Sequence, residues 1–305
     1  MRGPEPVTGR FAPSPSGRMH LGNLWSCLLA WLGARSTGGR VVLRLEDLDP
    51  DRCRQSFCEQ VMRDLEWLGL DWDGAPVYQS RRTGLYARAF SRLEEQGLAY
   101  PCFCSRAQRL AAGAPHRGDR ADSCLCRGLS PEERARLLRE RRPAWRLQVP
   151  DRTFSLQDLV QGHYEENLAR DCGDFILRRS DGVYAYQLAV VVDDAEMGVT
   201  QVVRGNDLLS SAPRQNYLQD LLGLPRPRYA HIPLLLAADG RRLAKRDRDQ
   251  ELSALQARFT APELVGRLAC LAGLLPAPEP IRPVQLLPLF SWGKLPREDI
   301  RVGAW

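Results

Sequence analysis

The segment RFAPSPSGRMHLGN, residues 10–23, joins a stiff turn to a histidine immediately before a run of apolar residues. Pro13 and Pro15 restrict the chain, while Gly17 and Gly22 allow tight turning and close backbone approach. The helix expected after this turn offers free N–H groups and a positive dipole to an anion, and the histidine adds a donor. The pattern predicts either a phosphate site or a turn with a structural role.

A second basic element follows near residue 240, in the segment ADGRRLAKRDRD. Lys245 and Lys294 are the only lysines among 43 basic residues, so a lysine surrounded by arginines calls for a chemical reason. A compact ammonium on a flexible stem suits the β- and γ-phosphates of a nucleotide better than a planar guanidinium. No P-loop or G-x-G-x-x-G motif occurs, so His20 and Lys245 are the candidate phosphate contacts.

Acidic residues end the segment LRLEDLDPDR, which alternates like a strand. Alternation places Leu43 and Leu45 on one face and Arg44 and Glu46 on the other. Glu46, or one of the two aspartates at 47 and 49, can hold a substrate ammonium. The alternative, that these acids cap the next helix or pair with nearby arginines, is equally open for the aspartates.

Four cysteines form two close pairs, Cys102 with Cys104 and Cys124 with Cys126. Four thiolates suit a closed tetrahedral zinc site, although C-x-C spacing is less diagnostic than C-x-x-C. Four reduced cysteines in a loop-rich insertion are the alternative. The histidines at 116, 163 and 231 have no evident partners in the sequence, and we expect core or surface positions for them.

Composition is that of a globular protein, with 44% hydrophobic and 26% charged residues. No apolar run reaches the length of a membrane span, and the first ten residues do not resemble a secretory signal, so we expect a cytoplasmic protein with reduced cysteines. The net charge of +6 favours a polyanionic partner weakly, because a compositional bias toward arginine explains it equally well.

Helical and β-branched segments alternate through the first hundred residues, which predicts an α/β fold with a parallel, Rossmann-type sheet. Residues 101–175 break this rhythm and predict an inserted subdomain that carries the cysteines. Alternation resumes over residues 176–250, the second half of the sheet domain. Residues 251–305 are expected to form a short helical tail without an anticodon-binding domain.

With these motifs in view, the chain resembles class I aminoacyl-tRNA synthetases. HLGN at 20–23 resembles their HIGH motif and RLAKR at 242–246 their KMSKS motif. Together with LRLEDLDPDR and VVVDDAEMGVTQVVRGNDLL, these segments are similar to the glutamyl/glutaminyl branch from about residue 8 to 250. The short remainder is similar to the truncated glutamyl-Q tRNA(Asp) synthetase family.

This resemblance implies an enzyme that activates L-glutamate with ATP, accompanied by Mg²⁺, and transfers it to the queuosine base in the anticodon of tRNA(Asp). Attack of the α-carboxylate on the α-phosphorus needs no covalent enzyme intermediate, so positioning and charge stabilisation supply the catalysis. The resemblance implies catalytic roles for His20 and Lys245. It implies glutamate contacts from Arg10, Phe11, Ala12, Pro13, Ser14, Glu46, Tyr186 and Arg204, and ATP contacts from His20, Gly22, Asn23 and Lys245.

Relatives in this family carry Cys-x-Cys, then a tyrosine four residues before a third cysteine, which implies one structural zinc. Cys102, Cys104 and Cys126 match this pattern, while Asp122 replaces the tyrosine. We expect Cys124 to be the fourth ligand, with Asp122 as the second choice.

Two positions depart from the synthetase motifs. Asn23 replaces the second histidine of HIGH, and Ala244 replaces the serine of KMSKS. Loss of one preorganised donor costs roughly 10²-fold in rate, so we expect a slower but active enzyme in which Ala244→Ser speeds ATP–pyrophosphate exchange. Two alternatives stay open, a minimal glutamyl-tRNA synthetase acting on tRNA(Glu) and an inactive RNA-binding paralogue. A monomer without membrane association is expected.

Overall fold

A computed structural model describes residues 6–104, 124–243 and 251–303 of the chain. The strands are β1 (Thr8–Phe11), β2 (Arg40–Leu45), β3 (Val77–Tyr78), β4 (Ala99–Cys102), β5 (Ala144–Leu147), β6 (Thr153–Asp158), β7 (Gly162–Asn167), β8 (Phe175–Arg178), β9 (Gln201–Gly205), β10 (Arg228–Ile232), β11 (Leu235–Leu236) and β12 (Ile300–Arg301). The α-helices are α1 (Leu21–Arg35), α2 (Gln55–Leu68), α3 (Thr83–Glu95), α5 (Pro131–Glu140), α6 (Tyr186–Glu196), α7 (Ser211–Leu222), α8 (Leu252–Gln256), α9 (Ala261–Leu271) and α10 (Pro283–Leu286).

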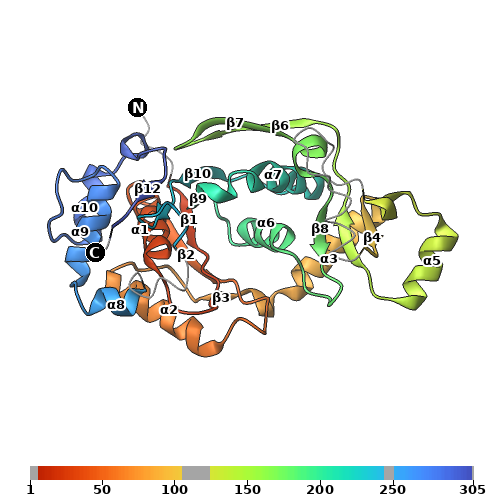
Figure 1. Ribbon diagram of the computed structural model, residues 1–305, viewed down its shortest axis with the longest axis horizontal. Helices are drawn as coiled ribbons and strands as arrows, with labels where there is room; N and C mark the ends of the chain where they lie inside the picture. The colour runs from red at the N-terminus through yellow and green to blue at the C-terminus, as the bar shows by residue number, and fades with distance from the viewer. Residues whose placement is uncertain (1–5, 105–123, 244–250, 304–305) are drawn as a thin grey trace.

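The predicted parallel sheet is confirmed. Strands β1, β2 and β3 pair in parallel in that order, and β9 pairs in parallel with β10. The two groups meet at β1 and β9, where the Thr200 N–H donates to Thr8 O at 2.9 Å and Arg10 Nη1 donates to Val203 O at 2.7 Å. Figure 1 shows α1 lying against these strands, so the carboxyl ends of β1 and β9 meet beside its N-terminus.

Residues between the two halves of the sheet form antiparallel structure. Strands β4, β5 and β8 make a three-stranded sheet, and β6 pairs with β7 in a hairpin. In Figure 1 the three-stranded sheet and α5 lie at the right-hand end, and the hairpin extends back along the molecule toward β10. Its turn is tied to that strand, because the Leu159 N–H donates to Tyr229 O at 2.9 Å. The division of the chain into four segments stays a prediction.

Local sequence accounts for several element boundaries. Helix α5 begins at a capping box in which Ser130 Oγ accepts the Glu133 N–H and the Glu133 carboxylate accepts the Ser130 N–H. Helix α2 ends at Gly69, whose φ of 78° is left-handed and therefore favours glycine. Ser130 and Gly69 therefore pair backbone groups at the start of α5 and at the end of α2.

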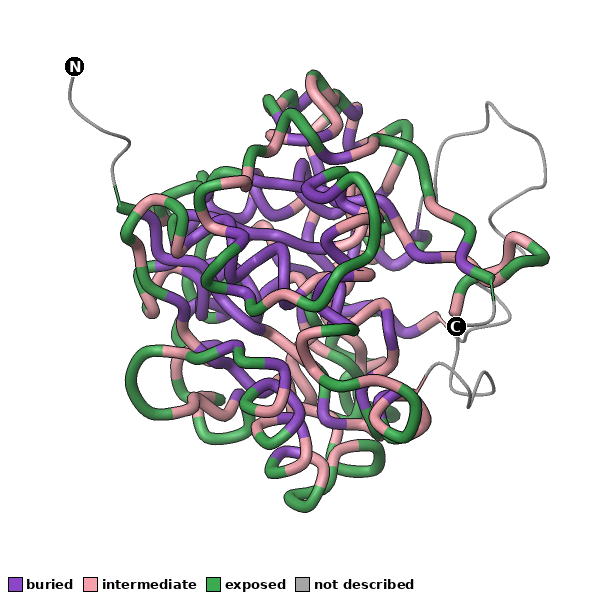
Figure 2. Tube along the Cα trace, turned by 90° about the vertical axis from the view of Figure 1, so that its left-hand side faces the viewer, coloured by how far each residue is buried: buried purple, intermediate pink, exposed green. Residues whose placement is uncertain are grey.

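Apolar side chains fill the space on both faces of the parallel sheet, and Figure 2 shows this buried region as a continuous interior. Helix α1 is buried along most of its length, with Leu24, Trp25, Leu28 and Leu32 at most 1% exposed. A second cluster joins α3, α6 and α7 to the three-stranded sheet. Within the described ranges no helix combines the length and hydropathy that crossing a bilayer requires.

Candidate active site

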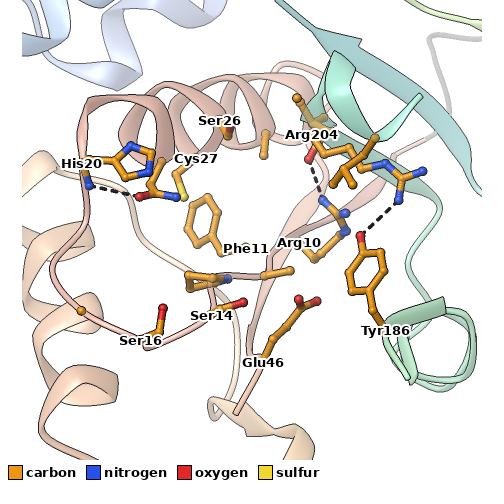
Figure 3. Close-up of a pocket in the computed structure, with 18 of the residues that line it drawn as sticks. Arg10, Phe11, Ser14, Ser16, His20, Ser26, Cys27, Glu46, Tyr186 and Arg204 are labelled. Atoms are coloured by element: carbon orange, nitrogen blue, oxygen red, sulfur yellow. Dashed lines mark hydrogen bonds between the residues drawn. The ribbon is translucent and has the colours of Figure 1, made fainter. Parts of the chain in front are cut away.

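A cavity of about 580 Å³ opens where β1, β2 and β9 end (Figure 3). Carboxyl ends of parallel strands are the expected ligand position in such a sheet. The predicted residues that line it are Arg10, Phe11, Ala12, Pro13, Ser14, His20, Asn23, Glu46, Tyr186 and Arg204. Sequence reasoning missed Ser16, Gly17, Arg18, Ser26, Cys27, Ala30, Val203, Gly205 and Leu208, which also line it.

Arg204, the penultimate residue of β9, lines one end of the cavity, and its side chain is buried. Its Nη1 donates to Gln215 Oε1 at 2.8 Å and to the Tyr186 hydroxyl at 3.4 Å, and its Nε donates to His231 Nε2 at 3.0 Å. Its Nη2 is buried and has no hydrogen-bond partner among the described residues. A buried guanidinium that lines a cavity and keeps an unused donor is suited to bind an anion such as a carboxylate.

Glu46 provides the opposite charge from the residue directly after β2, and Figure 3 shows its carboxylate pointing into the cavity. Arg44 Nη2 donates to Glu46 Oε1 at 3.1 Å, as the predicted strand alternation requires. Burial raises the pKa of Glu46, against the opposing effect of Arg44 and Arg10. Because its side chain is largely desolvated, an ammonium at this carboxylate would face little competition from water.

A cluster of buried charges holds Arg44, the partner of Glu46, in place. Arg44 Nη1 donates to Asp194 Oδ1, and Arg10 Nε lies 3.8 Å from the same oxygen. Burial lowers the pKa of Arg10, whereas for Arg44 the surrounding carboxylates outweigh burial and raise the pKa. Arginine is not deprotonated in proteins, so both guanidinium groups are charged, and both are paired with Asp194.

Asp193, next to that carboxylate on α6, is fully buried and binds three side chains in or shortly before α3. It accepts hydrogen bonds from Gln79 Nε2 at 2.8 Å, Arg82 Nε at 2.7 Å and the Tyr86 hydroxyl at 2.7 Å. These contacts hold the start of α3 and the end of α6 in register beside the cavity. Sequence reasoning did not identify any of them.

A second cavity of about 270 Å³ shares His20, Asn23 and Ser26 with the first and continues past the N-terminus of α1. Gly22, Asp207, Leu235 and Arg242 are among its other lining residues. Asn23 Oδ1 accepts the His20 N–H at 3.0 Å, so the amide that replaces the second histidine of the motif caps the helix. The start of α1 therefore lines both cavities, where its free N–H groups and its dipole favour an anion.

Gly22 is required by the closeness of the His20 ring. A Cβ atom at position 22 would lie 3.2 Å from His20 Cε1 and Nδ1. We expect Gly22→Ala to displace the ring by a few tenths of an ångström and to lower kcat/KM for ATP by about tenfold, since misplaced contacts cost this much in rate. Steady-state ATP–pyrophosphate exchange measures the effect.

Gly84 offers a matched control, because it is also the second residue of a helix, α3. A Cβ there would meet only Arg88 Nη1, at 3.9 Å. We expect Gly84→Ala to leave exchange unchanged and to raise thermal stability slightly. Equal effects of the two substitutions on exchange would contradict the role assigned to Gly22.

Lys245 and Ala244 lie outside the described residues, and the predicted phosphate contact of Lys245 stays a prediction. The chain on both sides of this gap borders the cavities. Leu243 lines the second cavity, and Glu251 forms a β-bridge with His20.

The aspartates at 47 and 49 have structural partners. Asp47 accepts from the Ser80 N–H at 2.9 Å and from its hydroxyl at 2.6 Å. Asp49 lies 3.5 Å from Arg179 and 3.8 Å from Arg52. Asp49 therefore pairs with Arg52, as the structural alternative states, whereas Asp47 binds Ser80, a partner that the sequence did not indicate. His231, expected in the core or at the surface, is fully buried.

The four clustered cysteines come together at the end of β4. Their sulfur atoms all lie within 4.8 Å of one another, and none forms a disulfide. Cys124 Sγ lies 3.3 Å from Cys102 Sγ and 3.7 Å from Cys104 Sγ, and Cys126 Sγ lies 3.5 Å from Cys104 Sγ. Four thiolates each about 2.3 Å from one zinc ion lie about 3.8 Å apart, so the donor set fits this metal. Asp122 lies outside the described residues.

The family model for the catalytic domain of class I tRNA synthetases (E and Q) matches residues 6–278. Among solved structures, a glutamate tRNA ligase from Elizabethkingia meningosepticum in complex with its amino acid is similar, with a TM-score of 0.83 and 28% sequence identity. That similarity covers 98% of this chain and 68% of the ligase.

Curated relatives resemble this chain more closely in sequence and in length than that ligase does. The glutamyl-Q tRNA(Asp) synthetase of Symbiobacterium thermophilum is 49% identical over 98% of this chain and 96% of its own. Its counterpart from Nitratidesulfovibrio vulgaris is 51% identical over 96% and 95%, and that from Neisseria meningitidis 45% over 96% and 98%. The chain therefore belongs to the class I aminoacyl-tRNA synthetases for glutamate and glutamine, and within them to the glutamyl-Q tRNA(Asp) synthetase family.

Proposed function

We propose that this enzyme activates L-glutamate with ATP and transfers the glutamyl group to the queuosine base of tRNA(Asp). The names and full-length coverage of the curated relatives support this assignment. The observation that carries the choice of amino acid is the buried, unpartnered Nη2 of Arg204 in a cavity whose other wall holds Glu46. An α-amino acid with a carboxylate side chain presents the complementary charges.

In the pose that these charges favour, the glutamate side-chain carboxylate binds Arg204 and Tyr186, and its ammonium binds Glu46. The α-carboxylate then points along the cavity toward His20, where the second cavity begins. ATP, with Mg²⁺, occupies that second space with its phosphates near the first turn of α1, and Lys245 contributes from the motif loop. Attack on the α-phosphorus gives glutamyl-adenylate and pyrophosphate, and the chain contributes by orientation and charge stabilisation.

A structural zinc ion bound by Cys102, Cys104, Cys124 and Cys126 completes the proposal. The sulfur–sulfur spacing supports it, and the Phe103 N–H lies 3.3 Å from Cys126 Sγ, a hydrogen bond of the kind that stabilises a bound thiolate. With all four positions filled by protein, this ion has no role in the reaction itself. It would connect the end of β4 to the chain that enters α5.

Amino-acid-dependent ATP–pyrophosphate exchange tests the activation step. We expect exchange with L-glutamate, and at least 10²-fold lower kcat/KM with L-glutamine or L-aspartate, because a carboxamide lacks the charge and a shorter chain cannot reach both ends of the cavity. Absence of exchange with all three would contradict an active synthetase and favour the RNA-binding paralogue. The monomeric state and cytoplasmic location remain expectations.

A further inference from the structure

A carboxylate and an imidazole lie buried behind Arg204, on the side away from the cavity. Asp158 is the last residue of β6, at the turn of the β6–β7 hairpin, and His231 belongs to β10. Their side chains are fully buried, and His231 Nδ1 lies 2.6 Å from Asp158 Oδ2. The hairpin of the 101–175 segment therefore reaches the wall of the catalytic cavity.

The contact with Arg204 defines which ring nitrogen carries the proton. Arg204 Nε always bears a hydrogen, and it lies 3.0 Å from His231 Nε2. Nε2 must therefore accept, which places the single proton on Nδ1, facing Asp158. Burial and the nearby guanidinium keep the pKa of His231 below its ordinary value despite Asp158, so the ring is neutral at neutral pH.

Backbone donors hold the carboxylate of Asp158 in one orientation. Its Oδ1 accepts the N–H groups of Val160 and Gln161, each at 2.9 Å, and the His231 N–H lies 3.1 Å from both oxygens. Although burial opposes ionisation, the hydrogen bonds from His231 and these amides lower the pKa of Asp158. Asp158 is therefore ionised, and its Oδ2 meets His231 alone, through the backbone N–H and the imidazole.

These contacts restrict the guanidinium. His231 accepts from Nε, Gln215 and Tyr186 accept from Nη1, and Nη2 is buried without a hydrogen-bond partner among the described residues. The Arg204 guanidinium also lies 5.2 Å from the ring centroid of Tyr229, which stacks beside His231. The hydrogen bonds and the Tyr229 ring together fix the orientation of the Arg204 guanidinium.

We propose that Asp158 and His231 are positioning residues that orient Arg204 for the side-chain carboxylate of the amino-acid substrate. Asp158 selects the Nδ1-protonated tautomer, and the lone pair of Nε2 then holds the guanidinium in one orientation at the wall of the cavity. The identity of the ligand rests on the function proposed above. Neither residue touches the substrate, so both act on glutamate binding and on discrimination against glutamine, and not on the chemical step.

Asp158→Asn tests the tautomer directly. The amide oxygen is expected to stay with the Val160 and Gln161 N–H groups, which turns the NH₂ group toward His231 Nδ1. Nδ1 must then accept, and the proton moves to Nε2, where it opposes the Arg204 N–H. We expect KM for glutamate to rise roughly tenfold or more, since hydrogen bonds to charged groups contribute this much, with kcat and KM for ATP unchanged.

Two substitutions at His231 separate positioning from packing. The side-chain oxygen of His231→Gln can occupy the place of Nε2 and accept from Arg204, whereas His231→Leu removes the acceptor. We expect the leucine variant to raise KM for glutamate as Asp158→Asn does, and the glutamine variant to recover most of the loss. Equal KM values in the two variants would overturn the proposal.

Asp174→Asn is the matched control. Asp174 is also buried and accepts a backbone N–H, from Val149 at 2.8 Å, and a side-chain donor, the Tyr100 hydroxyl at 2.8 Å, but it has no contact with Arg204. We expect lower thermal stability with an unchanged KM for glutamate. A similar rise in KM in this control would show that loss of stability alone explains the effect.

The tautomer also has a readout independent of activity. Only four histidines occur in the chain, so the ring ¹⁵N signals of His231 are assigned by difference with His231→Gln. We expect a protonated Nδ1 in the wild type and a protonated Nε2 in Asp158→Asn. Wild-type exchange without dependence on glutamate would refute the proposed function, whereas glutamate-dependent wild-type exchange with an unaltered KM and tautomer in Asp158→Asn would refute only the positioning role.

Discussion

Replacing Arg204 with glutamine is expected to raise KM for glutamate by between about 30-fold and 10³-fold. This range equals roughly 2–4 kcal/mol, which lies within the roughly 2–5 kcal/mol lost when one partner of a buried, hydrogen-bonded charge pair is removed. The substitution removes the charge at the cavity wall and the Nη2 donor, which has no partner among the described residues. It also leaves the acceptors of His231 and Gln215 without their donor. Glutamate-dependent ATP–pyrophosphate exchange gives KM for both substrates.

Two further variants show whether the rise in KM depends on the shape of the guanidinium and whether it is specific to the cavity. Arg204→Lys keeps the charge but loses the planar fork, so we expect it to recover only a small part of glutamate binding. Arg146→Gln is the control, because Arg146 is equally buried and its Nε donates to Asp174 O at 3.0 Å, away from the cavity. An unchanged KM for glutamate in Arg204→Gln, with ATP binding intact, would remove Arg204 from the amino-acid site.

Cys124→Ser is expected to strip the cysteine cluster of its metal. A hydroxyl does not replace the thiolate, and affinity for zinc should fall by more than the roughly 10- to 100-fold that loss of an outer-shell partner costs. Because bound metal stabilises the folded state, the variant should unfold at a lower temperature and respond little to added zinc. Elemental analysis after dialysis against a chelator, together with thermal unfolding, measures both effects.

Asp122→Ala distinguishes the two candidates for the fourth ligand. If Cys124 completes the site, the alanine variant keeps about one zinc per chain and unfolds as the wild type does. Retention of zinc by Cys124→Ser and its loss from Asp122→Ala would reverse the assignment. Amino-acid activation in freshly purified, folded samples should differ little among these variants. Figure 1 shows β4, where the cluster begins, well separated from β1 and β9, where the first cavity opens.

Local patterns in the sequence account for much of the fold and for the front wall of the cavity. The turn before α1 and the strand that leads to Glu46 are short-range signals, and both place their residues where the pattern indicates. Helix α6 is harder to predict, because it contains the β-branched run Val190–Val192 and is buried on all sides. Such a helix lacks the 3.6-residue periodicity that marks an amphipathic one.

The groups behind the cavity could not be predicted, because their partners are far apart in the chain. Asp158 and His231 are 73 residues apart, and Gln79 and Asp193 are 114 apart. No spacing rule connects such pairs, and a lone buried histidine looks the same in the sequence whether or not it has a partner. The pairing depends on how the β6–β7 hairpin packs on β10, which only the tertiary structure shows.

The most direct test of the proposed reaction is transfer of labelled glutamate to RNA. The substrates are tRNA(Asp) with queuosine, tRNA(Asp) without it, and tRNA(Glu), each incubated with enzyme and ATP. We predict label on tRNA(Asp) only when queuosine is present. Label on tRNA(Glu), or equal labelling of tRNA(Asp) with and without queuosine, would contradict the proposed reaction, and the first of these results would identify a minimal glutamyl-tRNA synthetase.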